Sequence, residues 1–305
     1  MNIVRGKQKS AARVVIYGTE GIGKSTMASQ FPSPLILDTE DGSKHLDCAR
    51  VICSDWMTLE STMHELVRDA QGFETVVIDS ADWMERMMID QIVRQAGKKS
   101  IEDFGFGKGY IHVQERVAKF LAIADQLIAR GINVVFVAHS KVQRTSPPDQ
   151  TDGYDRYELK LTKQVAPLLR EWCDLLLFTN YKTKLVEGSD GRIKASGGKE
   201  RVMYAERSAA WDAKNRFGLP EEMPMLIDRL DPIFGGSPAA ADSAVAAIMA
   251  KAAKTIAAAN DEAALAKCRK RVDQLLADGT LTTTLWSALT DQIDAKAPPS
   301  EVVNA

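Results

Sequence analysis

A glycine-rich segment constrains this chain more than any other feature, because Gly18-Thr-Glu-Gly-Ile-Gly-Lys-Ser25 fits the pattern G-x-x-x-x-G-K-[ST]. The apolar run Arg13–Tyr17 predicts a buried strand before it, and a helix is predicted from about Lys24. In such a unit, successive backbone N–H groups turn toward phosphates, a lysine reaches the β and γ phosphates, and a hydroxyl ligates magnesium. We therefore expect a site that binds and hydrolyses ATP with Mg²⁺, in which Lys24 is catalytic and Ser25 binds the metal. The expected ATP-binding residues are Gly18, Thr19, Glu20, Gly21, Ile22, Gly23, Lys24, Ser25 and Thr26.

From residue 13 to about 230, short apolar runs alternate with helical patterns, which predicts an α/β fold with a mostly parallel central sheet. The further central strands are expected at Leu35–Thr39, Thr75–Ile78, Asn133–Ala138 and Asp174–Thr179. The helices between them are expected at Thr58–Ala70, Ala81–Gln95 and Ile111–Arg130. After Tyr181 the pattern favours a hairpin, with the turn Gly188-Ser-Asp-Gly191 between Lys182–Glu187 and Ile193–Ala195, and a strand at Arg201–Glu206.

A domain boundary is expected near Phe234-Gly-Gly-Ser-Pro238, where glycine and proline interrupt the pattern. It separates an ATPase domain, residues 1–234, from a helical region, residues 235–305. That region predicts helices at Ala239–Ala259, Glu262–Ala277 and Thr282–Lys296, with a frayed end from Pro298.

The net charge, the cysteines and the hydrophobic runs argue against several classes of protein. The formal net charge of -2 argues against a uniformly basic nucleic-acid coat, although a local basic groove remains compatible with it. The four cysteines form no CxxC pair, so we expect neither disulfides nor a zinc site, which suits a reducing cytosol. No apolar run approaches the length of a membrane span. We therefore expect a soluble cytoplasmic protein with no membrane partner.

Acidic residues follow two of the predicted strands. Asp79 ends the run Val76–Ile78, where a carboxylate can hold magnesium, usually through water. It also fits a cap of the following helix, although Ser80 and Asp82 could serve as that cap. Glu40 lies just past the second strand, where a carboxylate could deprotonate the attacking water. Asp38 and Asp41 are rivals for this role.

His139 follows the run Asn133–Ala138, so we expect it beside the γ phosphate. A polar side chain there can sense whether that phosphate is present. A lone histidine also fits a structural residue.

In this order, these residues resemble the RecA-type recombinase and ATPase core over roughly residues 10–230. The resemblance implies a RecA-like fold, a catalytic role for Glu40, and a magnesium strand that ends in Asp79 and Ser80. His139 stands where that family has a glutamine that couples the γ phosphate to a DNA-binding loop, so histidine is a departure from the pattern.

The resemblance also implies contacts with DNA and with neighbouring subunits. Two segments, residues 97–110 and 140–157, occupy the family's DNA-binding positions and mix cationic with aromatic residues. The expected DNA-binding residues are Lys108, Tyr110, Lys141, Arg144, Arg156 and Tyr157. Ala213–Gly218 resembles a K-x-R-x-G segment whose cations, here Lys214 and Arg216, would act catalytically at the neighbouring subunit's ATP. The two segments 97–110 and 140–157 also fit ordinary surface loops, and Ala213–Gly218 also fits an ordinary basic turn.

More narrowly, the chain resembles bacteriophage RecA-like ATPases of single-strand annealing and recombination. That resemblance implies single-stranded DNA as a partner, assembly into a ring or a filament, and location in a bacterial host cell. It also leaves room for a phage or host single-strand-binding or replication protein as a partner. A helicase loader that uses ATP as a switch is the main alternative. A small-molecule kinase is a weaker one, because no compact arginine-rich lid is evident.

Overall fold

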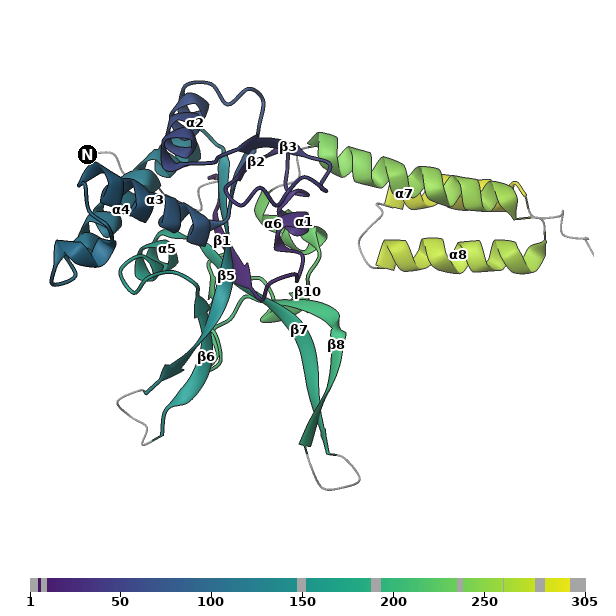
Figure 1. Cartoon of the computed structure of the whole chain (residues 1–305). Coiled ribbons are helices and arrows are strands. Elements are labelled where there is room, and N and C mark those ends of the chain that lie inside the picture. Colours follow the sequence, from purple (N-terminus) through teal and green to yellow (C-terminus); the bar gives the residue numbers. More distant parts are fainter. Residues whose placement is uncertain are drawn as a thin grey trace, which may run out of the picture. The chain divides into compact units, whose positions relative to one another are not determined.

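Figure 1 shows the computed structural model, which describes residues 5–6, 10–146, 152–187, 193–234, 238–259, 261–277 and 283–296. The chain divides into two compact units, Met1–Gly235 and Gly236–Ala305. The turn expected at Gly188–Gly191 and the frayed end expected from Pro298 lie outside the described residues.

The first unit is built on one sheet, whose main path follows the order β10-β8-β7-β1-β5-β4-β2-β3. The central pairs are parallel: β1 lies between β5 and β7, and β4 lies between β5 and β2. The expected α/β fold with a mostly parallel central sheet is therefore confirmed. The strands are β1 (Arg13–Gly18), β2 (Pro34–Asp38), β3 (Ala49–Ile52), β4 (Thr75–Asp79), β5 (Asn133–Thr145), β6 (Tyr154–Leu159), β7 (Leu175–Glu187), β8 (Ile193–Tyr204), β9 (Lys214–Asn215) and β10 (Glu222–Pro224).

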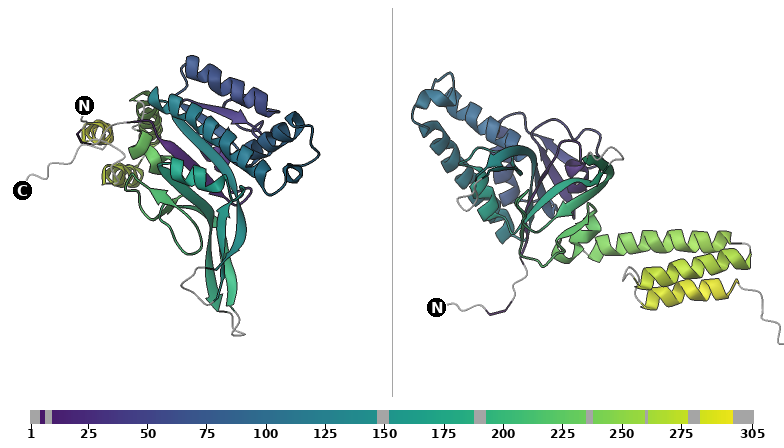
Figure 2. Two further views of the ribbon diagram at one scale, coloured as in Figure 1. Left: turned by 90° about the vertical axis from the view of Figure 1, so that its left-hand side faces the viewer. Right: turned by 90° about the horizontal axis from the view of Figure 1, so that it is seen from below.

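Both faces of the sheet are covered, which explains why its central strands read as continuous apolar runs. In β1, Val15 and Tyr17 enter one apolar layer, whereas Val14 and Ile16 enter the other. Helices α2 (Trp56–Arg68), α3 (Ala81–Gln95), α4 (Lys108–Ala129) and α5 (Ala166–Trp172), with the short helix η1 (Ile101–Phe104), contribute to the first layer. The second layer receives residues from α1 (Lys24–Ala28), η2 (Ile227–Leu230) and α6 (Asp231–Phe234). Figure 2 shows the helices on either side of the sheet.

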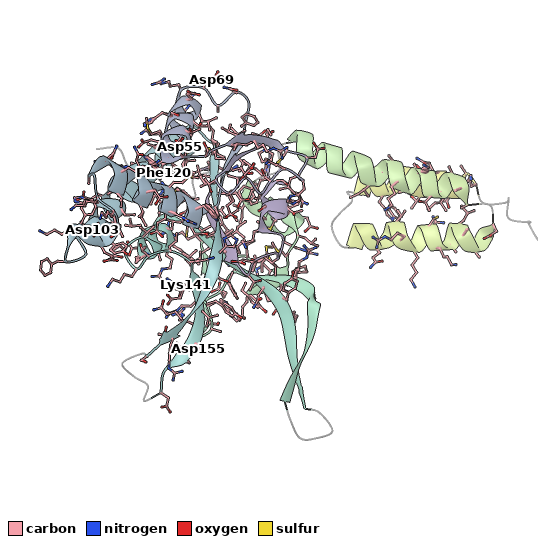
Figure 3. All side chains as sticks on the ribbon, in the orientation of Figure 1. Asp55, Asp69, Asp103, Phe120, Lys141 and Asp155 are labelled. Atoms are coloured by element: carbon pink, nitrogen blue, oxygen red, sulfur yellow. The ribbon has the colours of Figure 1, made fainter. Side chains whose placement is uncertain are left out.

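The first apolar layer is anchored by aromatic side chains. Phe120 of α4, labelled in Figure 3, lies 5.2 Å from Trp56 of α2 and 6.4 Å from Phe136 of β5, measured between ring centroids. The three residues are almost completely buried. Burying such side chains contributes about 1.5–3 kcal/mol each, so these contacts fix α2 and α4 against the strand that leads to His139.

Two long hairpins project from the end of the sheet at which β1 stops (Figure 1). Strand β5 continues past Ala138 and pairs antiparallel with β6, and β7 continues past Thr179 and pairs antiparallel with β8. The segment 140–157, expected to be a loop, is therefore largely a hairpin, because β5 keeps its ladder with β6 through Thr145. Segment 97–110 is likewise not one loop: it contains η1 and the first turn of α4, which follows Gly107 at φ 72°.

The second unit contains α7 (Pro238–Ala258), α8 (Glu262–Ala277) and α9 (Thr283–Asp294). Ile256, Leu265, Val272, Leu289 and Ile293 form its buried core. None of the helices in the described part of the chain is long and apolar enough to cross a membrane.

Candidate nucleotide site

The glycine-rich segment begins where β1 ends and uses its glycines in two ways. Gly18 stands opposite His139 of β5 and Thr179 of β7. A Cβ atom on Gly18 would lie 2.1 Å from the Thr179 carbonyl oxygen, so only glycine fits between these strands. Gly21 and Gly23, by contrast, have φ values of 72° and 100°, in the left-handed region that favours glycine. The loop therefore needs Gly18 for close packing and the later glycines for its curvature.

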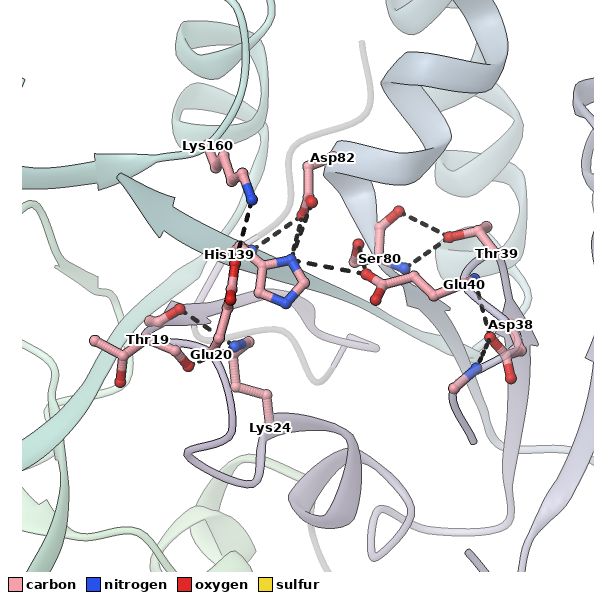
Figure 4. Close-up of polar contacts among 12 residues, drawn as sticks. Thr19, Glu20, Lys24, Asp38, Thr39, Glu40, Ser80, Asp82, His139 and Lys160 are labelled. Carbon is pink, nitrogen blue, oxygen red and sulfur yellow. Dashed lines mark hydrogen bonds and ion pairs between the residues drawn. The ribbon is translucent and has the colours of Figure 1, made fainter. Parts of the chain in front are cut away.

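Lys24 lies inside the loop rather than on the surface. It is 5% exposed, and its Nζ donates to the carbonyl oxygens of Gly18 at 3.2 Å and Thr19 at 2.9 Å (Figure 4). Burial lowers the pKa of its ammonium group, while the charge of Asp79 opposes that shift. The Thr19 hydroxyl is buried and has no hydrogen-bond partner among the described residues. The loop thus carries the Lys24 cation and the unsatisfied Thr19 hydroxyl, and both groups suit an oxygen-rich anion such as a phosphate.

Asp79 and Ser25 bring two oxygen donors to the same place. Asp79 ends β4 and is 8% exposed. Burial raises its pKa to about 6, whereas a hydrogen bond from Ser25 lowers it. A carboxylate and a hydroxyl are the ligand types that Mg²⁺ takes beside nucleotide phosphates. These residues therefore fit a magnesium ion.

The three acidic residues after β2 have different surroundings. Asp38 accepts hydrogen bonds from the backbone N–H groups of residues 40, 42 and 43 and from the Ser43 hydroxyl. Burial raises the pKa of Asp38, but these hydrogen bonds outweigh it and the net shift is downward. Asp41 is exposed and pairs with Lys44. Glu40 instead accepts a hydrogen bond from the Ser80 hydroxyl, beside the loop (Figure 4). Of the three carboxylates, only that of Glu40 joins the cluster that also contains His139.

His139 is held by Asp82, from the first turn of α3. Its backbone N–H donates to Asp82 Oδ1 at 3.0 Å, and its Nδ1 lies 3.0 Å from Asp82 Oδ2. The hydrogen bond with Asp82 raises the pKa of His139, and the nearby Glu40 carboxylate, with Oε1 3.7 Å from Nδ1, adds to the rise. Ligand atoms of Glu40, Asp82 and His139 lie within 4.8 Å of one another. The sequence suggested Asp82 only as a helix cap, because its partner lies 57 positions away.

This arrangement of loop, carboxylates and histidine agrees with the comparison with known families, in which an AAA domain matches residues 10–217. The chain belongs to this AAA-domain family. Its first unit is therefore a P-loop ATPase core that binds nucleotide. The SPbeta prophage-derived uncharacterized protein YorG of Bacillus subtilis is 23% identical over 137 residues. That match covers 42% of this chain and 40% of the length of YorG. Among solved structures, the flagellar accessory protein FlaH from Methanocaldococcus jannaschii gives a TM-score of 0.31 at 10% identity, covering 68% of this chain and 90% of that chain.

Three further side chains of the AAA domain reach the loop from the hairpins. Lys160, just after β6, lies 3.3 Å from the Glu20 carboxylate. The Tyr181 hydroxyl of β7 donates to the Gly21 carbonyl at 3.4 Å, and Arg201 of β8 donates to the Ile22 carbonyl at 3.2 Å. These contacts have no local sequence signature, because they join segments 140 to 179 positions apart.

The residues expected to bind DNA are dispersed over the AAA domain. Lys108 and Tyr110 lie in the first turn of α4, where the Tyr110 hydroxyl donates to Glu102 at 2.6 Å. Lys141, at the base of the β5–β6 hairpin, donates to the Leu161 carbonyl, and Arg144 is exposed farther along β5. Figure 3 labels Lys141 and Asp155 on this hairpin.

The expectation for Arg156 and Tyr157 needs correction. Arg156 is 7% exposed and its Nη2 lies 2.6 Å from Asp212 Oδ1, so burial and this ion pair withhold its guanidinium from a DNA phosphate. The ring of Tyr157 packs on Phe178, with centroids 4.9 Å apart, and this packing turns it toward the core. Both residues stabilise the base of the hairpin instead.

Lys214 and Arg216 lie at the end of the sheet opposite the loop, because β9 pairs with the beginning of β7. The Lys214 Nζ donates to the carbonyls of Arg170 and Glu171 at 3.0 and 2.9 Å, which caps the last turn of α5. Arg216 forms an ion pair with Asp174 at 2.8 Å. Neither cation reaches its own subunit's loop, and action on a neighbouring subunit stays a prediction.

Proposed function

We propose that this AAA-domain protein is a Mg²⁺-dependent ATPase that acts on single-stranded DNA. The observation that carries the proposal is the course of β5, which runs without interruption from the buried core through His139 into the exposed β5–β6 hairpin. The strand thus joins the nucleotide site to an exposed hairpin.

Nucleotide binding follows from the loop and its neighbours. Lys24 and the backbone N–H groups of the loop bind the phosphates, and Thr19 gains the partner that its hydroxyl lacks. Ser25 and Asp79 would hold the magnesium ion. When bound, that ion neutralises charge on the phosphate oxygens.

Hydrolysis needs a group that takes a proton from the attacking water, and Glu40 supplies it. Its carboxylate lies at the site, fixed by the Ser80 hydroxyl, whereas Asp38 is committed to the turn that follows β2. A positioned general base contributes about 10²–10⁴-fold in rate. Glu40→Gln should therefore bind ATP but lose most of its turnover.

The Asp82–His139 pair distinguishes ATP from ADP by the presence of the γ phosphate. Asp82 favours the cationic form of His139, and a cation attracts the terminal phosphate of ATP more strongly than the shorter ADP. Any movement of His139 passes directly to Ser140 and Lys141 at the base of the hairpin. This is the physical route by which ATP would change the affinity of the hairpin for DNA.

DNA contact in this proposal rests on exposed cations, chiefly Arg144 of the hairpin and Lys108 of α4. The prophage origin of YorG supports a role in bacteriophage recombination or annealing. Head-to-tail assembly would bring Lys214 and Arg216 toward the ATP of a neighbouring subunit.

The test measures ATP turnover with and without single-stranded DNA for the wild type, Glu40→Gln and the matched control Asp41→Asn, together with ATP affinity by calorimetry. We expect DNA to stimulate the wild type and the control, and Glu40→Gln to bind ATP with little turnover. Loss of turnover in Asp41→Asn or Asp38→Asn but not in Glu40→Gln would contradict the assignment of the base. ATP-dependent partner binding without DNA-stimulated turnover would favour the helicase-loader alternative.

DNA binding is tested separately by its dependence on salt. Removing a phosphate contact should flatten the log–log slope by about 0.7 for a single strand. Arg144→Ala should show this change, whereas Arg94→Ala, an exposed arginine on α3, should not. An absence of single-strand binding at low salt in the presence of an ATP analogue would overturn the DNA part of the proposal.

A further inference from the structure

A cross-strand pair at the base of the second hairpin contacts the phosphate-binding loop. Tyr181 of β7 and Arg201 of β8 stand directly opposite each other in the antiparallel ladder. Residues paired in this way point to the same face of a sheet. Their side chains donate to the carbonyls of Gly21 and Ile22, two successive residues of the loop. The hairpin base therefore contacts the loop at the positions just before Gly23 and Lys24.

The guanidinium of Arg201 comes close to the loop because residue 23 has no side chain. A Cβ atom on Gly23 would lie 2.7 Å from Arg201 Nη1, closer than real contacts allow. The motif requires glycine here for its φ of 100°, and the same glycine leaves the space in which the guanidinium lies. Arg201 thus approaches the loop within one residue of Lys24.

Arg201 retains unused capacity for an anion. It is exposed, and within the described part of the chain no carboxylate lies within ion-pair distance of it. A guanidinium offers five N–H donors in a planar fork that matches phosphate oxygens, and the Ile22 carbonyl engages only one nitrogen. Glu40, Asp79 and Asp82 lie close enough to Lys24 for their charges to act on its ammonium group, and they lower the positive potential there. A triphosphate therefore needs a further cation, and Arg201 is placed to supply it.

We propose that Arg201 binds phosphate oxygens of the nucleotide held by its own subunit's loop. This inference rests on the proposed nucleotide binding and adds a phosphate ligand from the β7–β8 hairpin. It differs from the role expected of Arg216, which lies at the opposite end of the sheet and pairs with Asp174. One arginine acts within the subunit, and the other could act only on a neighbour.

The experiment measures the affinity of MgATP and MgADP for the wild type, Arg201→Ala and Arg201→Lys by calorimetry. Arg229→Ala is the matched control, because Arg229 is also exposed and, among the residues that the structure describes, pairs only with the neighbouring Asp228. Loss of a charge-assisted hydrogen bond corresponds to a rise in Kd of about 10- to 100-fold. We expect that rise for Arg201→Ala, a smaller one for Arg201→Lys, and none for the control.

The same affinity measurement is repeated at a protein concentration at which mass photometry shows a monomer. It distinguishes an arginine that acts within its own subunit from one that acts on a neighbouring subunit. A loss of affinity in the monomer supports action within the subunit, whereas a loss confined to assembled protein would overturn it. Wild-type affinity in Arg201→Ala, with its far-ultraviolet circular dichroism unchanged, would also overturn it. If Arg201→Ala fails to fold, Arg201→Lys and Arg201→Gln provide the comparison. A wild type that binds no ATP would instead refute the proposed function itself.

Discussion

Replacing Gly18 by alanine should damage the fold far more than replacing Gly21, although both glycines belong to one motif. The added Cβ at position 18 would lie 2.1 Å from the Thr179 carbonyl oxygen and 2.3 Å from the Thr179 hydroxyl oxygen. Thr179 is completely buried, and its hydroxyl donates to the Tyr17 carbonyl at 3.1 Å. Relief would require β1 and β7 to separate. Overpacking of this kind costs about 1–3 kcal/mol, and contact with the backbone of a central strand places the cost near the upper value.

At Gly21 the reasoning differs, because no atom of the described residues lies within 4 Å of the added Cβ, and the φ of 72° is what opposes it. The left-handed conformation costs alanine about 1–2 kcal/mol. The lower entropy of the unfolded chain returns about 0.4–1 kcal/mol of this. Gly21→Ala should therefore cost about 0–1.6 kcal/mol, with a middle value of roughly 1 kcal/mol. The expected difference between the two variants is about 2 kcal/mol.

Thermal and urea unfolding of the two variants checks this difference. At about 2–4 °C per kcal/mol for a unit of this size, Gly18→Ala should lower Tm by about 6–12 °C and Gly21→Ala by only about 2–4 °C. Fluorescence of Trp56, Trp172 and Trp211 reports on this unit. Equal Tm values for the two variants would refute the distinction between a packing glycine and a turn glycine.

Other perturbations test neighbouring parts of the site. Asp38→Asn should destabilise the first unit in urea unfolding, because an amide accepts the backbone hydrogen bonds of the following turn less strongly than a carboxylate; unchanged stability would contradict this. The pKa of His139 is higher in the folded protein than its value of 6.5 in the unfolded chain. Its pairing with Asp82 therefore stabilises the fold fully at a pH below 6.5, and this stabilisation is lost as the pH rises through the pKa of the folded protein. The lowered pKa of Asp82 removes that stability again in acid, so the difference between wild type and His139→Gln should be larger at about pH 6 than at about pH 9. A difference in stability between the two proteins that does not depend on pH would exclude the ionic pairing of His139 with Asp82. Mixing Arg216→Ala with Lys24→Ala should restore turnover if Arg216 serves a neighbouring loop, and no recovery would exclude a shared site.

The sequence predicted those elements whose signal is local. The bounds of α3 and α8 agree with the expected Ala81–Gln95 and Glu262–Ala277, because both helices have clear periodicity and flanking caps or breakers. The sequence does not predict the short edge strand β3, since its half-exposed residues form no apolar run. It predicts a loop at the β5–β6 hairpin, because the residues after Ala138 are mostly polar and the ladder depends on pairing across the turn.

The same distinction applies to the site. The loop and Asp79 could be found from motif and strand alone, since each is a contiguous signal. Asp82 and Arg201 could not, because what defines them is contact with His139 and Ile22, at separations of 57 and 179 positions. Likewise, the ion pair with Asp212 that withdraws Arg156 from the surface spans 56 positions and has no local signature.

The ladder between β7 and β8 is interrupted by a register shift between Tyr181 and Thr183, one residue beyond the pair that contacts the loop. An irregularity of this kind concentrates bending, because the ladder bonds that would resist it are locally missing. The outer hairpin can therefore pivot at this point while Tyr181 and Arg201 keep their contacts with the loop. In β5–β6 the register is regular from Ser140 to Thr145, so that hairpin can move only together with the strand that holds His139. The outer part of the β7–β8 hairpin can thus move without moving the nucleotide site, whereas the β5–β6 hairpin moves together with it.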